Sequence, residues 1–367
     1  MENFIVSARK YRPDSFRTVV AQDSITATLK NAIRGRQLAH SYLFCGPRGV
    51  GKTTCARIFA KTINCSNLGP DTEACNQCES CTAFNNNRSY NIHELDAASN
   101  NSVDDIRNLI DQVRIPPQIG SYSVYIIDEV HMLSSQAFNA FLKTLEEPPR
   151  HALFILATTE KHKIIPTILS RCQIFDFNRI KVGDIVGHLD YVAKEEGVQI
   201  EHNALNVIAN KADGAMRDAL SIFDQIVSFS GREISYQDVI SNLNVLDYEY
   251  YFRLTDLFLR NEVTETLLVF NEILNKGFEG QHFIGGLASH FRDLLVSRDA
   301  VTVQLLEVGG DIRERYKAQA ANCDPGFLME ALRLSNECDY QYKSSQNKRL
   351  SIELALVRIA QLTLKKK

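Results

Sequence analysis

The sequence predicts an α/β domain built on a five-stranded parallel sheet, followed by two all-helical domains. Short apolar runs alternate with helical patterns up to Asn178, which is typical of a parallel sheet covered by helices. A phosphate-binding motif lies between the first of these runs and the first helical pattern, and only helical patterns remain after about Arg179. Because 367 residues exceed one ordinary hydrophobic core, we expect two or three domains.

The sheet is predicted from apolar runs that are short enough to be buried strands. In chain order they are Ser41–Cys45, Asn91–Leu95, Val124–Asp128, Leu153–Ala157 and Gln173–Phe177. Apolar residues at helical spacing predict helices between them, over Thr53–Ile63, Val103–Val113 and Ser135–Glu146. Pro148 and Pro149 end the last of these helices, and we place the whole α/β domain at residues 1–178.

Two helical domains are expected after the sheet, a small one over residues 179–243 and a larger one over residues 244–367. The helical patterns of the small domain are Val182–Glu196, His202–Lys211, Met216–Phe229 and Tyr236–Leu243. Those of the larger domain are Tyr248–Arg260, Val263–Lys276, Gly280–Ser297, Pro325–Lys343 and Asn347–Leu364. The last pattern is apolar nearly all round, so this helix packs either against another subunit or inside its own domain. Periodicity alone does not decide between the two.

The segment from Gly46 to Thr53 fills every fixed position of the motif G-x-x-x-x-G-K-[ST]. Glycines let backbone N–H groups turn toward phosphate oxygens, the lysine neutralises charge on the β- and γ-phosphates, and the hydroxyl binds Mg²⁺. The helix that follows directs the positive end of its dipole at the phosphates. A glycine-rich turn that contains Lys-Thr by chance is the alternative. We predict a nucleoside triphosphate, ATP, bound by Gly46, Pro47, Arg48, Gly49, Val50, Gly51, Lys52, Thr53 and Thr54.

An acidic pair is predicted to complete the site at the end of the strand Val124–Asp128. Asp128 leaves the strand where a carboxylate can join Thr53 in holding Mg²⁺. Glu129 is then free to orient or deprotonate the attacking water. Two surface acids after a strand are the alternative, but the phosphate-binding motif upstream favours the catalytic interpretation.

Polar residues next to the last two strands of the sheet are further candidates for the site. Thr158 and Thr159 come after Leu153–Ala157, where a hydroxyl would lie between the acidic pair and the γ-phosphate and could sense that phosphate. Arg171 precedes the last strand of the sheet. It either pairs with a local acid or projects to the ATP of a neighbouring subunit, and the sequence leaves both interpretations open.

The chain has nine cysteines, and four of them have the spacing of a metal site. They are Cys65, Cys75, Cys78 and Cys81, with nine, two and two residues between them. Four thiolates at this spacing can surround a tetrahedral Zn²⁺, and since no histidine or carboxylate adjoins them in a way that suggests an open catalytic position, we expect a closed, structural site. Unliganded thiols and another metal are the alternatives. The remaining five, interpreted as small core residues, are Cys45, Cys55, Cys172, Cys323 and Cys338.

Charge and hydropathy narrow the classes of partner. The 41 Lys and Arg residues are balanced by 44 Asp and Glu residues, so the net charge of −3 argues against a uniformly basic nucleic-acid surface. Any contact with DNA must therefore be local or shared among subunits. With 44% hydrophobic residues and no apolar run long enough to span a bilayer, the sequence predicts a cytoplasmic protein without membrane contact.

Several further segments are similar to those of a known family. These segments are Ala8–Pro13 with Phe16 and Val19-Val20, Asp128–His131, Leu133–Pro149 and Ser170–Cys172. Together with the four-cysteine insertion, they resemble the γ/τ subunits of the bacterial DNA polymerase III clamp loader, which are AAA+ ATPases. The resemblance runs from about residue 4 to 230 in motif detail and to the end of the chain in domain plan. It implies an AAA+ domain with a zinc knob inserted at about residues 64–82, a helical lid over 179–243 and an all-helical collar over 244–367.

The resemblance also implies roles for individual residues. Thr159 would be the first sensor of the γ-phosphate and Arg217 the second, reaching ATP from the lid. Arg171 would be the arginine finger supplied to an adjacent subunit. From the residues alone, Arg217 beside Asp218 is equally well a surface charge on a helix. The implied adenine pocket is formed by Ala8, Tyr11, Arg12, Pro13, Val19 and Val20.

The implied function is ATP hydrolysis that drives loading of a sliding clamp onto primer-template DNA during DNA replication. The implied partners are δ, δ′ and further γ/τ copies in a pentameric ring, as part of the DNA polymerase III holoenzyme with its DNA-directed DNA polymerase activity. The chain departs from the family pattern in Arg48, which occupies a free position of the motif. It also ends at Lys367 without the C-terminal extension of the longer τ form, so the short form and a shortened longer form are both possible.

Other functions remain as alternatives at this point. A branch-migration helicase would share the phosphate-binding motif and the acidic pair, but it should carry a winged DNA-binding domain where only helices are expected. A non-hydrolysing structural member of the same ring would lose Lys52, Thr53, Asp128 and Glu129, which are all present. A zinc interaction module with incidental nucleotide binding is disfavoured by the small size of the insertion.

Overall fold

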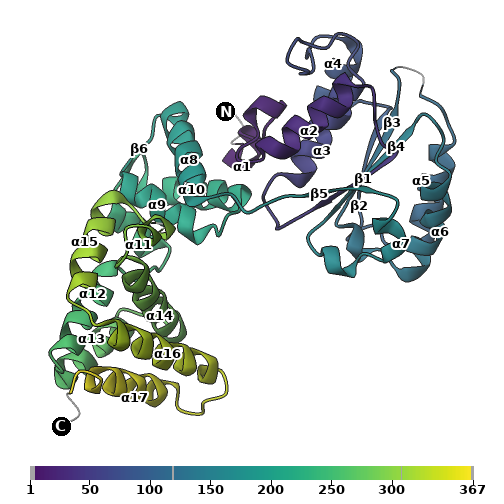
Figure 1. Ribbon diagram of the computed structural model, residues 1–367. Helices are drawn as coiled ribbons and strands as arrows, with labels where there is room; N and C mark the ends of the chain where they lie inside the picture. Colours follow the sequence, from purple (N-terminus) through teal and green to yellow (C-terminus); the bar gives the residue numbers. More distant parts are fainter. Residues whose placement is uncertain (1–4, 118–119, 307, 365–367) are drawn as a thin grey trace. The chain divides into compact units, whose positions relative to one another are not determined.

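The computed structural model describes residues 5–117, 120–306 and 308–364. It forms two compact units, the first made of Met1–Glu196 with Ala209–Gln225 and the second of Gly197–Ile208 with Ile226–Lys367 (Figure 1). Lys365, Lys366 and Lys367 at the end of the predicted collar lie outside the described residues, as do the first four residues of the predicted AAA+ domain. The division into AAA+ domain, lid and collar stays a prediction.

The first unit is organised by a five-stranded parallel sheet in the order β2-β3-β4-β1-β5, which confirms the predicted sheet. Its strands are β1 (Ser41–Cys45), β2 (Ile92–Asp96), β3 (Ser123–Asp128), β4 (Ala152–Thr158) and β5 (Gln173–Asp176). The residues of β1 and β4 are all buried, as expected for strands with neighbours on both sides and helices on both faces. In the register of these two strands Cys45 pairs with Thr158, so their carboxyl ends meet at one edge of the sheet.

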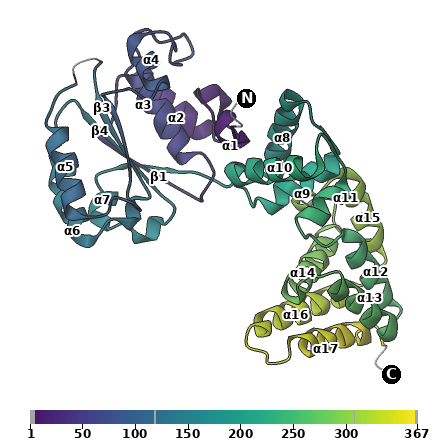
Figure 2. The same cartoon turned by 180° about the vertical axis from the view of Figure 1, so that it is seen from behind.

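Two layers of helices cover the sheet, because alternate residues of a strand point to opposite faces. Tyr42 and Phe44 of β1 join the core beneath α2 (Asp23–Arg34) and α3 (Lys52–Ile63). Leu43 and Cys45 join the core beneath α5 (Val103–Val113), α6 (Ser135–Glu146) and α7 (Pro166–Leu169). Figure 2 shows α2 and α3 on one side of the strands, with α5, α6 and α7 on the other.

Several elements were not predicted. They are the helices α1 (Ser7–Lys10), α2, α4 (Glu79–Asn85), α7 and α15 (Gly310–Ala321), together with the 3₁₀ turns η1 (Phe16–Thr18), η2 (Val130–Met132), η3 (Lys161–Lys163) and η4 (Thr302–Leu305). The expectation that strands end after Arg179 is wrong. β6 (Gln199–Ile200) pairs in parallel with β7 (Glu233–Ile234). Two residues are too short to show the alternation by which a strand is recognised in a sequence.

The remaining helices agree with their predicted ranges to within a few residues at the ends. They are α8 (Val182–Glu196), α9 (His202–Lys211), α10 (Met216–Ser230), α11 (Tyr236–Asn242), α12 (Tyr248–Leu259), α13 (Val263–Asn275), α14 (Gly280–Val296), α16 (Pro325–Tyr342) and α17 (Lys348–Gln361). Residues of both units belong to α9 and α10. Among the described residues, no helix is long and apolar enough to cross a membrane.

The second unit has its own core, formed mainly by α12, α13, α14, α16 and α17. The last helix, α17, buries Ile352, Leu356 and Ile359 in this core, while Leu350 and Leu354 stay about half exposed. Most of its apolar surface is therefore used inside its own unit. A wholly buried histidine, His290 of α14, lies among aromatic rings in the same core and is bonded to Tyr316 and Gln319 of α15.

Candidate nucleotide site and cysteine cluster

The predicted phosphate-binding loop joins the end of β1 to the start of α3. Three of its residues, Gly46, Gly49 and Gly51, have positive φ angles of 145°, 76° and 101°. A Cβ atom on Gly46 would lie 2.4 Å from the carbonyl oxygen of Phe177. Since side chains strain such a backbone and no space exists for one at Gly46, glycine is required there to shape the loop.

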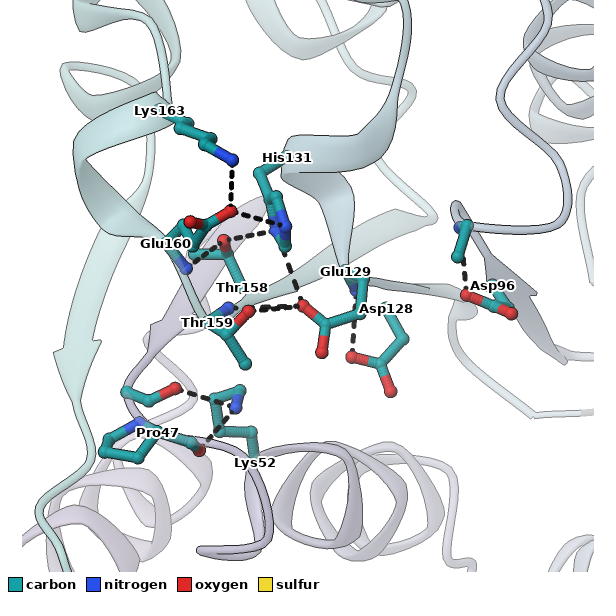
Figure 3. Close-up of polar contacts among 12 residues, drawn as sticks. Pro47, Lys52, Asp96, Asp128, Glu129, His131, Thr158, Thr159, Glu160 and Lys163 are labelled. Atoms are coloured by element: carbon teal, nitrogen blue, oxygen red, sulfur yellow. Dashed lines mark hydrogen bonds and ion pairs between the residues drawn. The ribbon is translucent and has the colours of Figure 1, made fainter. Parts of the chain in front are cut away.

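Lys52 is buried at the first turn of α3, and its side chain folds back over the loop. The Nζ atom donates hydrogen bonds of 2.8 Å to the carbonyl oxygens of Gly46 and Pro47 (Figure 3). Burial lowers the pKa of the Lys52 ammonium, while Glu129 and Asp128 act in the opposite direction. A cation is thus held at the loop by carbonyl dipoles and two nearby carboxylates, where it can neutralise phosphate charge.

Thr53 and Asp128 lie together beside the loop. The Thr53 hydroxyl donates a hydrogen bond of 2.6 Å to the Asp128 carboxylate, which extends from the end of β3 and also accepts the N–H of Glu129 at 2.9 Å. A hydroxyl and a carboxylate are oxygen ligands of the kind that Mg²⁺ prefers next to phosphates. These two residues therefore fit a magnesium site of the predicted kind.

Glu129 is a non-glycine residue in a left-handed backbone conformation, with a φ of 47°. Its carboxylate accepts hydrogen bonds from the Thr159 hydroxyl at 2.9 Å and from the Thr159 N–H at 3.3 Å (Figure 3). A non-glycine residue in this region of backbone space carries strain that the surrounding structure must offset, and such strain is commonly found at active sites. The structure thus joins the predicted base to the predicted sensor.

His131 was not assigned a role from the sequence, although it lies in the same short segment as the acidic pair. It is buried, and its Nδ1 atom is 3.0 Å from the Thr158 hydroxyl and 3.4 Å from the Glu129 carboxylate. Its Nε2 atom is 3.1 Å from Glu160, which pairs in turn with Lys163 at 2.5 Å. The imidazole therefore anchors the segment that carries Glu129 to the end of β4. A histidine two residues after an acid at a strand end is the signal that could have indicated this.

A cavity of about 500 Å³ opens beside the loop and is lined by both apolar and cationic side chains. The predicted site residues in its lining are Ala8, Tyr11, Arg12, Pro13, Val19, Val20, Gly49, Val50, Gly51, Thr53, Thr54, Asp128 and Arg217. Arg12 also donates to the Thr54 hydroxyl at 3.2 Å. Burial lowers the pKa of Arg12, and the neighbouring charges of Arg57 and Arg217 lower it further. Apolar walls with clustered cations suit a base at one end and phosphates at the other.

Other residues of this lining were missed by the sequence analysis, and they are Val6, Arg9, Ile180, His188, Met216 and Leu220. Met216 and Leu220 are four residues apart on α10, so they share a helix face next to Arg217. That spacing could have indicated them. His188 and Ile180 follow no local pattern, because only the folding of distant segments brings them to the cavity.

The other predicted phosphate-site residues outside this lining are placed differently. Gly46, Pro47, Lys52, Glu129 and Thr159 form the adjoining edge of the loop and sheet described above. Arg48 is exposed.

Arg171 lies away from the loop of its own chain. It precedes β5, whose first residue Gln173 pairs with Tyr42, so it is at the amino edge of the sheet, whereas the loop follows the carboxyl end of β1. At about 3.3 Å per residue the start of β5 lies about 13 Å from Gly46 along the strands, and Arg171 is in the turn before that start. Its guanidinium instead pairs with Glu146 at 2.6 Å and remains one-third exposed. The chain therefore does not bring Arg171 to its own candidate nucleotide site.

The four clustered cysteines come together between α3 and β2. Their sulfur atoms all lie within 4.8 Å of one another, and the cysteines are Cys65, Cys75, Cys78 and Cys81. In a tetrahedral site with Zn–S bonds of about 2.3 Å the sulfurs are about 3.8 Å apart, so this donor set fits zinc after a small contraction. Hydrogen bonds from the backbone N–H groups of Gln77 and Cys78 lower the pKa of Cys75, whereas burial raises the pKa of Cys65 and of Cys81.

The remaining cysteines lie in or against the hydrophobic cores. Cys45, Cys55, Cys323 and Cys338 are buried, and Cys172 is partly buried. Burial raises the pKa of each of these thiols. They behave as small apolar residues, in agreement with their interpretation from the sequence.

Two family descriptions match this chain. Residues 21–181 match "DNA polymerase III, delta subunit", and residues 184–232 match "DNA polymerase III clamp loader subunit, ATPase lid domain". The second match includes α8 and α10, which supply His188, Met216 and Arg217 to the cavity.

Relatives of the chain include DNA polymerase III subunit tau of Bacillus subtilis, which is 42% identical over 96% of this chain and 62% of its own length. DNA polymerase III subunit tau of Salmonella typhimurium is 35% identical over 97% of this chain and 55% of its own length. The chain thus spans a little over half the length of these relatives. DNA polymerase III subunit gamma of Buchnera aphidicola subsp. Acyrthosiphon pisum is 36% identical over 77% of this chain and 78% of its own length.

Among solved structures, the RuvB Holliday junction branch migration motor of Thermotoga maritima is a distant likeness. It is 20% identical, with a TM-score of 0.48, over 67% of this chain and 78% of that one.

Proposed function

Since this chain belongs to the γ/τ family of DNA polymerase III clamp-loader subunits, we propose that it binds and hydrolyses ATP to load a sliding clamp onto primed DNA. The observation that carries the proposal is the meeting of three features at one edge of the sheet. These are Lys52 over the phosphate-binding loop, the Thr53–Asp128 pair, and the contact between Glu129 and Thr159.

Each of these residues has a defined part in the proposed hydrolysis. Lys52 exchanges its loop carbonyls for the β- and γ-phosphates when ATP binds. Thr53 and Asp128 hold Mg²⁺, which when bound neutralises charge that develops on the phosphates. Glu129 orients and deprotonates the attacking water once Thr159 turns its hydroxyl from the carboxylate to the γ-phosphate. Hydrolysis then follows loss of the Glu129–Thr159 hydrogen bond.

The adjoining cavity is proposed to hold the rest of ATP. Val19, Val20 and Pro13 offer apolar surface to the adenine ring, and Arg12 faces the phosphates from the same wall. Arg217 of α10 is the proposed second sensor. The backbone N–H of Arg217 donates to the carbonyl oxygen of Gly49 at 3.4 Å, so the side chain of Arg217 begins next to the loop.

Arg171 is proposed to complete the site of a neighbouring subunit. Its exposed place on the far edge of the sheet supports an arginine finger supplied between subunits, because it cannot serve its own loop. Catalysis then depends on the geometry of the ring, and ATP hydrolysis can act as the switch that releases the clamp.

The proposed assembly is a pentameric ring with δ, δ′ and further γ/τ copies, which acts on the sliding clamp and primer-template DNA. We assign the DNA-directed DNA polymerase activity of the holoenzyme to its polymerase subunits rather than to the residues of this site. The four-cysteine cluster is proposed to hold one structural Zn²⁺ per chain. Elemental analysis of freshly purified protein by inductively coupled plasma mass spectrometry tests this, and protein without zinc would contradict it.

The central experiment measures steady-state ATP hydrolysis by the assembled ring, with and without sliding clamp and primed DNA. Arg171→Ala should leave the affinity of the chain for ATP nearly unchanged and remove the DNA-stimulated rate, because the guanidinium acts on another subunit's nucleotide. Arg114→Ala is a matched control, since Arg114 is also exposed and pairs with an acid of its own element, Asp111. Stimulation that survives Arg171→Ala, or hydrolysis as fast in a strictly monomeric preparation as in the ring, would refute the shared site.

A further inference from the structure

The segment that lines one wall of the cavity has little structure of its own. Residues 5–20 contain only α1, of four residues, and η1, of three residues. Helical turns this short are not stable without tertiary contacts. Yet Tyr11, Arg12, Pro13, Val19 and Val20 must be held in place for the cavity to exist. The position of this segment must therefore come from its neighbours.

One such neighbour is Glu73, which lies two residues before Cys75 in the cysteine insertion. Its carboxylate accepts the backbone N–H groups of Phe16 at 3.0 Å and Arg17 at 3.1 Å. These are the first two N–H groups of η1, which has no capping side chain of its own. Glu73 thus caps η1 from a distant part of the chain.

The Glu73 carboxylate is also well enclosed. It pairs with Lys30 of α2 at 2.7 Å, and the two side chains are only 16% and 20% exposed. A carboxylate with three charge-assisted contacts and little solvent contributes more than a surface ion pair. The contact between the insertion and η1 is therefore a firm one.

A second link runs through Lys61 of α3, which is 3% exposed. Its Nζ atom donates to the Asp14 carbonyl oxygen at 2.8 Å and to the Asn76 side-chain oxygen at 2.9 Å. Asn76 lies between the ligand candidates Cys75 and Cys78 and has a positive φ of 57°. The cavity segment and the cysteine loop thus share one buried cation. It contacts the cavity segment at Asp14, which immediately follows the cavity residues Arg12 and Pro13.

The insertion itself has no regular structure between Cys65 and Cys78, and α4 begins only at Glu79. The four sulfur atoms converge at one place in this insertion. Without a metal across them, a loop of this length gains conformational freedom, and Glu73 and Asn76 lose their fixed positions.

We propose that the metal-bound cysteine cluster positions the wall of the nucleotide cavity through Glu73 and Asn76, so that zinc occupancy sets the affinity of the chain for ATP. The proposal rests on the proposed nucleotide function and on zinc as the bound metal. Glu73 and Lys61 are positioning residues and touch neither base nor phosphate. By linkage the effect is reciprocal, so bound nucleotide should raise the affinity of the chain for zinc by the same factor.

The test measures the Kd of N-methylanthraniloyl-ATP for the full chain by fluorescence titration in excess Mg²⁺, with the zinc content of each sample measured in parallel. Glu73→Ala should raise this Kd about tenfold while zinc stays bound, because the wall is then formed in only a fraction of molecules. Glu73→Gln keeps one acceptor and should recover part of the affinity. Glu79→Ala is the matched control, since Glu79 is an exposed acid in the first turn of α4, and it should change the Kd less than twofold.

Removal of zinc from the wild type with a zinc-selective chelator should raise the Kd at least as much as Glu73→Ala, and added Zn²⁺ should restore it. The same treatment of Glu73→Ala should add little, because both changes act through one contact. Unchanged affinity in zinc-loaded Glu73→Ala would overturn the inference. A zinc-loaded wild type that binds no ATP would instead contradict the proposed function. If zinc removal unfolds the chain, Glu73→Ala decides alone, because it leaves the metal in place.

Discussion

The second unit should lose stability as the pH falls, because His290 binds a proton more readily in the unfolded chain than in the folded one. The Nδ1 atom of His290 is 2.9 Å from the Tyr316 hydroxyl, and its Nε2 atom is 3.3 Å from the side-chain oxygen of Gln319. The Gln319 amide nitrogen donates to the Phe252 carbonyl oxygen and to Asp256, both at 2.8 Å, so its oxygen must face His290. Nε2 therefore carries the proton and Tyr316 donates to Nδ1, so a second ring proton at Nδ1 would break this hydrogen bond and require the Tyr316 hydroxyl to turn.

The size of the effect follows from the pKa. Burial lowers the pKa of His290 to about 3, with the Gln319 hydrogen bond acting in the opposite direction. In the unfolded chain the value is about 6.5. Because the folded pKa is the lower one, the unfolded state binds the proton first, and stability present above pH 6.5 is lost as the pH falls. Between pH 7.5 and 5.0 the loss is about 2 kcal/mol, and it is the same for any folded pKa below about 4.

The assay is urea unfolding at both pH values, followed by far-UV circular dichroism of the helices, since the chain has no tryptophan. The double variant His290→Leu/Tyr316→Phe removes the titrating ring and the hydroxyl that it would leave unpaired. Other groups titrate equally in both proteins, so the wild type should lose about 2 kcal/mol more than the variant between the two pH values. Equal losses in the two proteins would refute a neutral, buried His290.

Three further changes test the loop and the cavity. Gly46→Ala places a Cβ atom 2.4 Å from the Phe177 carbonyl oxygen and should destabilise the first unit by at least about 2 kcal/mol, measured by thermal unfolding. Thr53→Ala should weaken ATP binding in Mg²⁺ and leave binding in EDTA unchanged, because the hydroxyl is proposed to act only through the metal; equal losses would contradict that role. Arg217→Ala should weaken ATP more than AMP in competition titrations, since its proposed contact is with the distal phosphates, and an equal loss for both would place the guanidinium elsewhere.

The strands and the phosphate-binding loop could be predicted because their signals are local. β1 was predicted at its observed bounds, since a short apolar run that leads directly into a glycine-rich phosphate-binding motif is typical of a buried strand. The acidic pair could be found in the same way, because Asp128 and Glu129 adjoin a buried strand. In contrast, α4 is a seven-residue helix that follows a loop without regular structure, and β6 and β7 are two residues long. Such elements have no periodicity to detect.

The lining of the cavity is a second feature that could not be predicted from the sequence. Its two walls come from the start of the chain and from α8 and α10, and no local pattern connects His188 with Val20. The pairing of Glu73 with η1 is of the same kind, because a capping acid is normally sought within a few residues of the helix that it caps. Contacts between distant segments had to be seen in three dimensions.

The left-handed backbone at position 129 has a consequence for protein engineering. Asparagine tolerates this conformation better than glutamate, so Glu129→Asn raises thermal stability where the relief of backbone strain exceeds the loss of the hydrogen bonds from Thr159. The same exchange removes the carboxylate proposed to activate water. A library of variants at position 129 that is screened only for heat resistance would therefore be enriched in inactive proteins. Selection for thermal stability and selection for ATP hydrolysis favour different residues at this position.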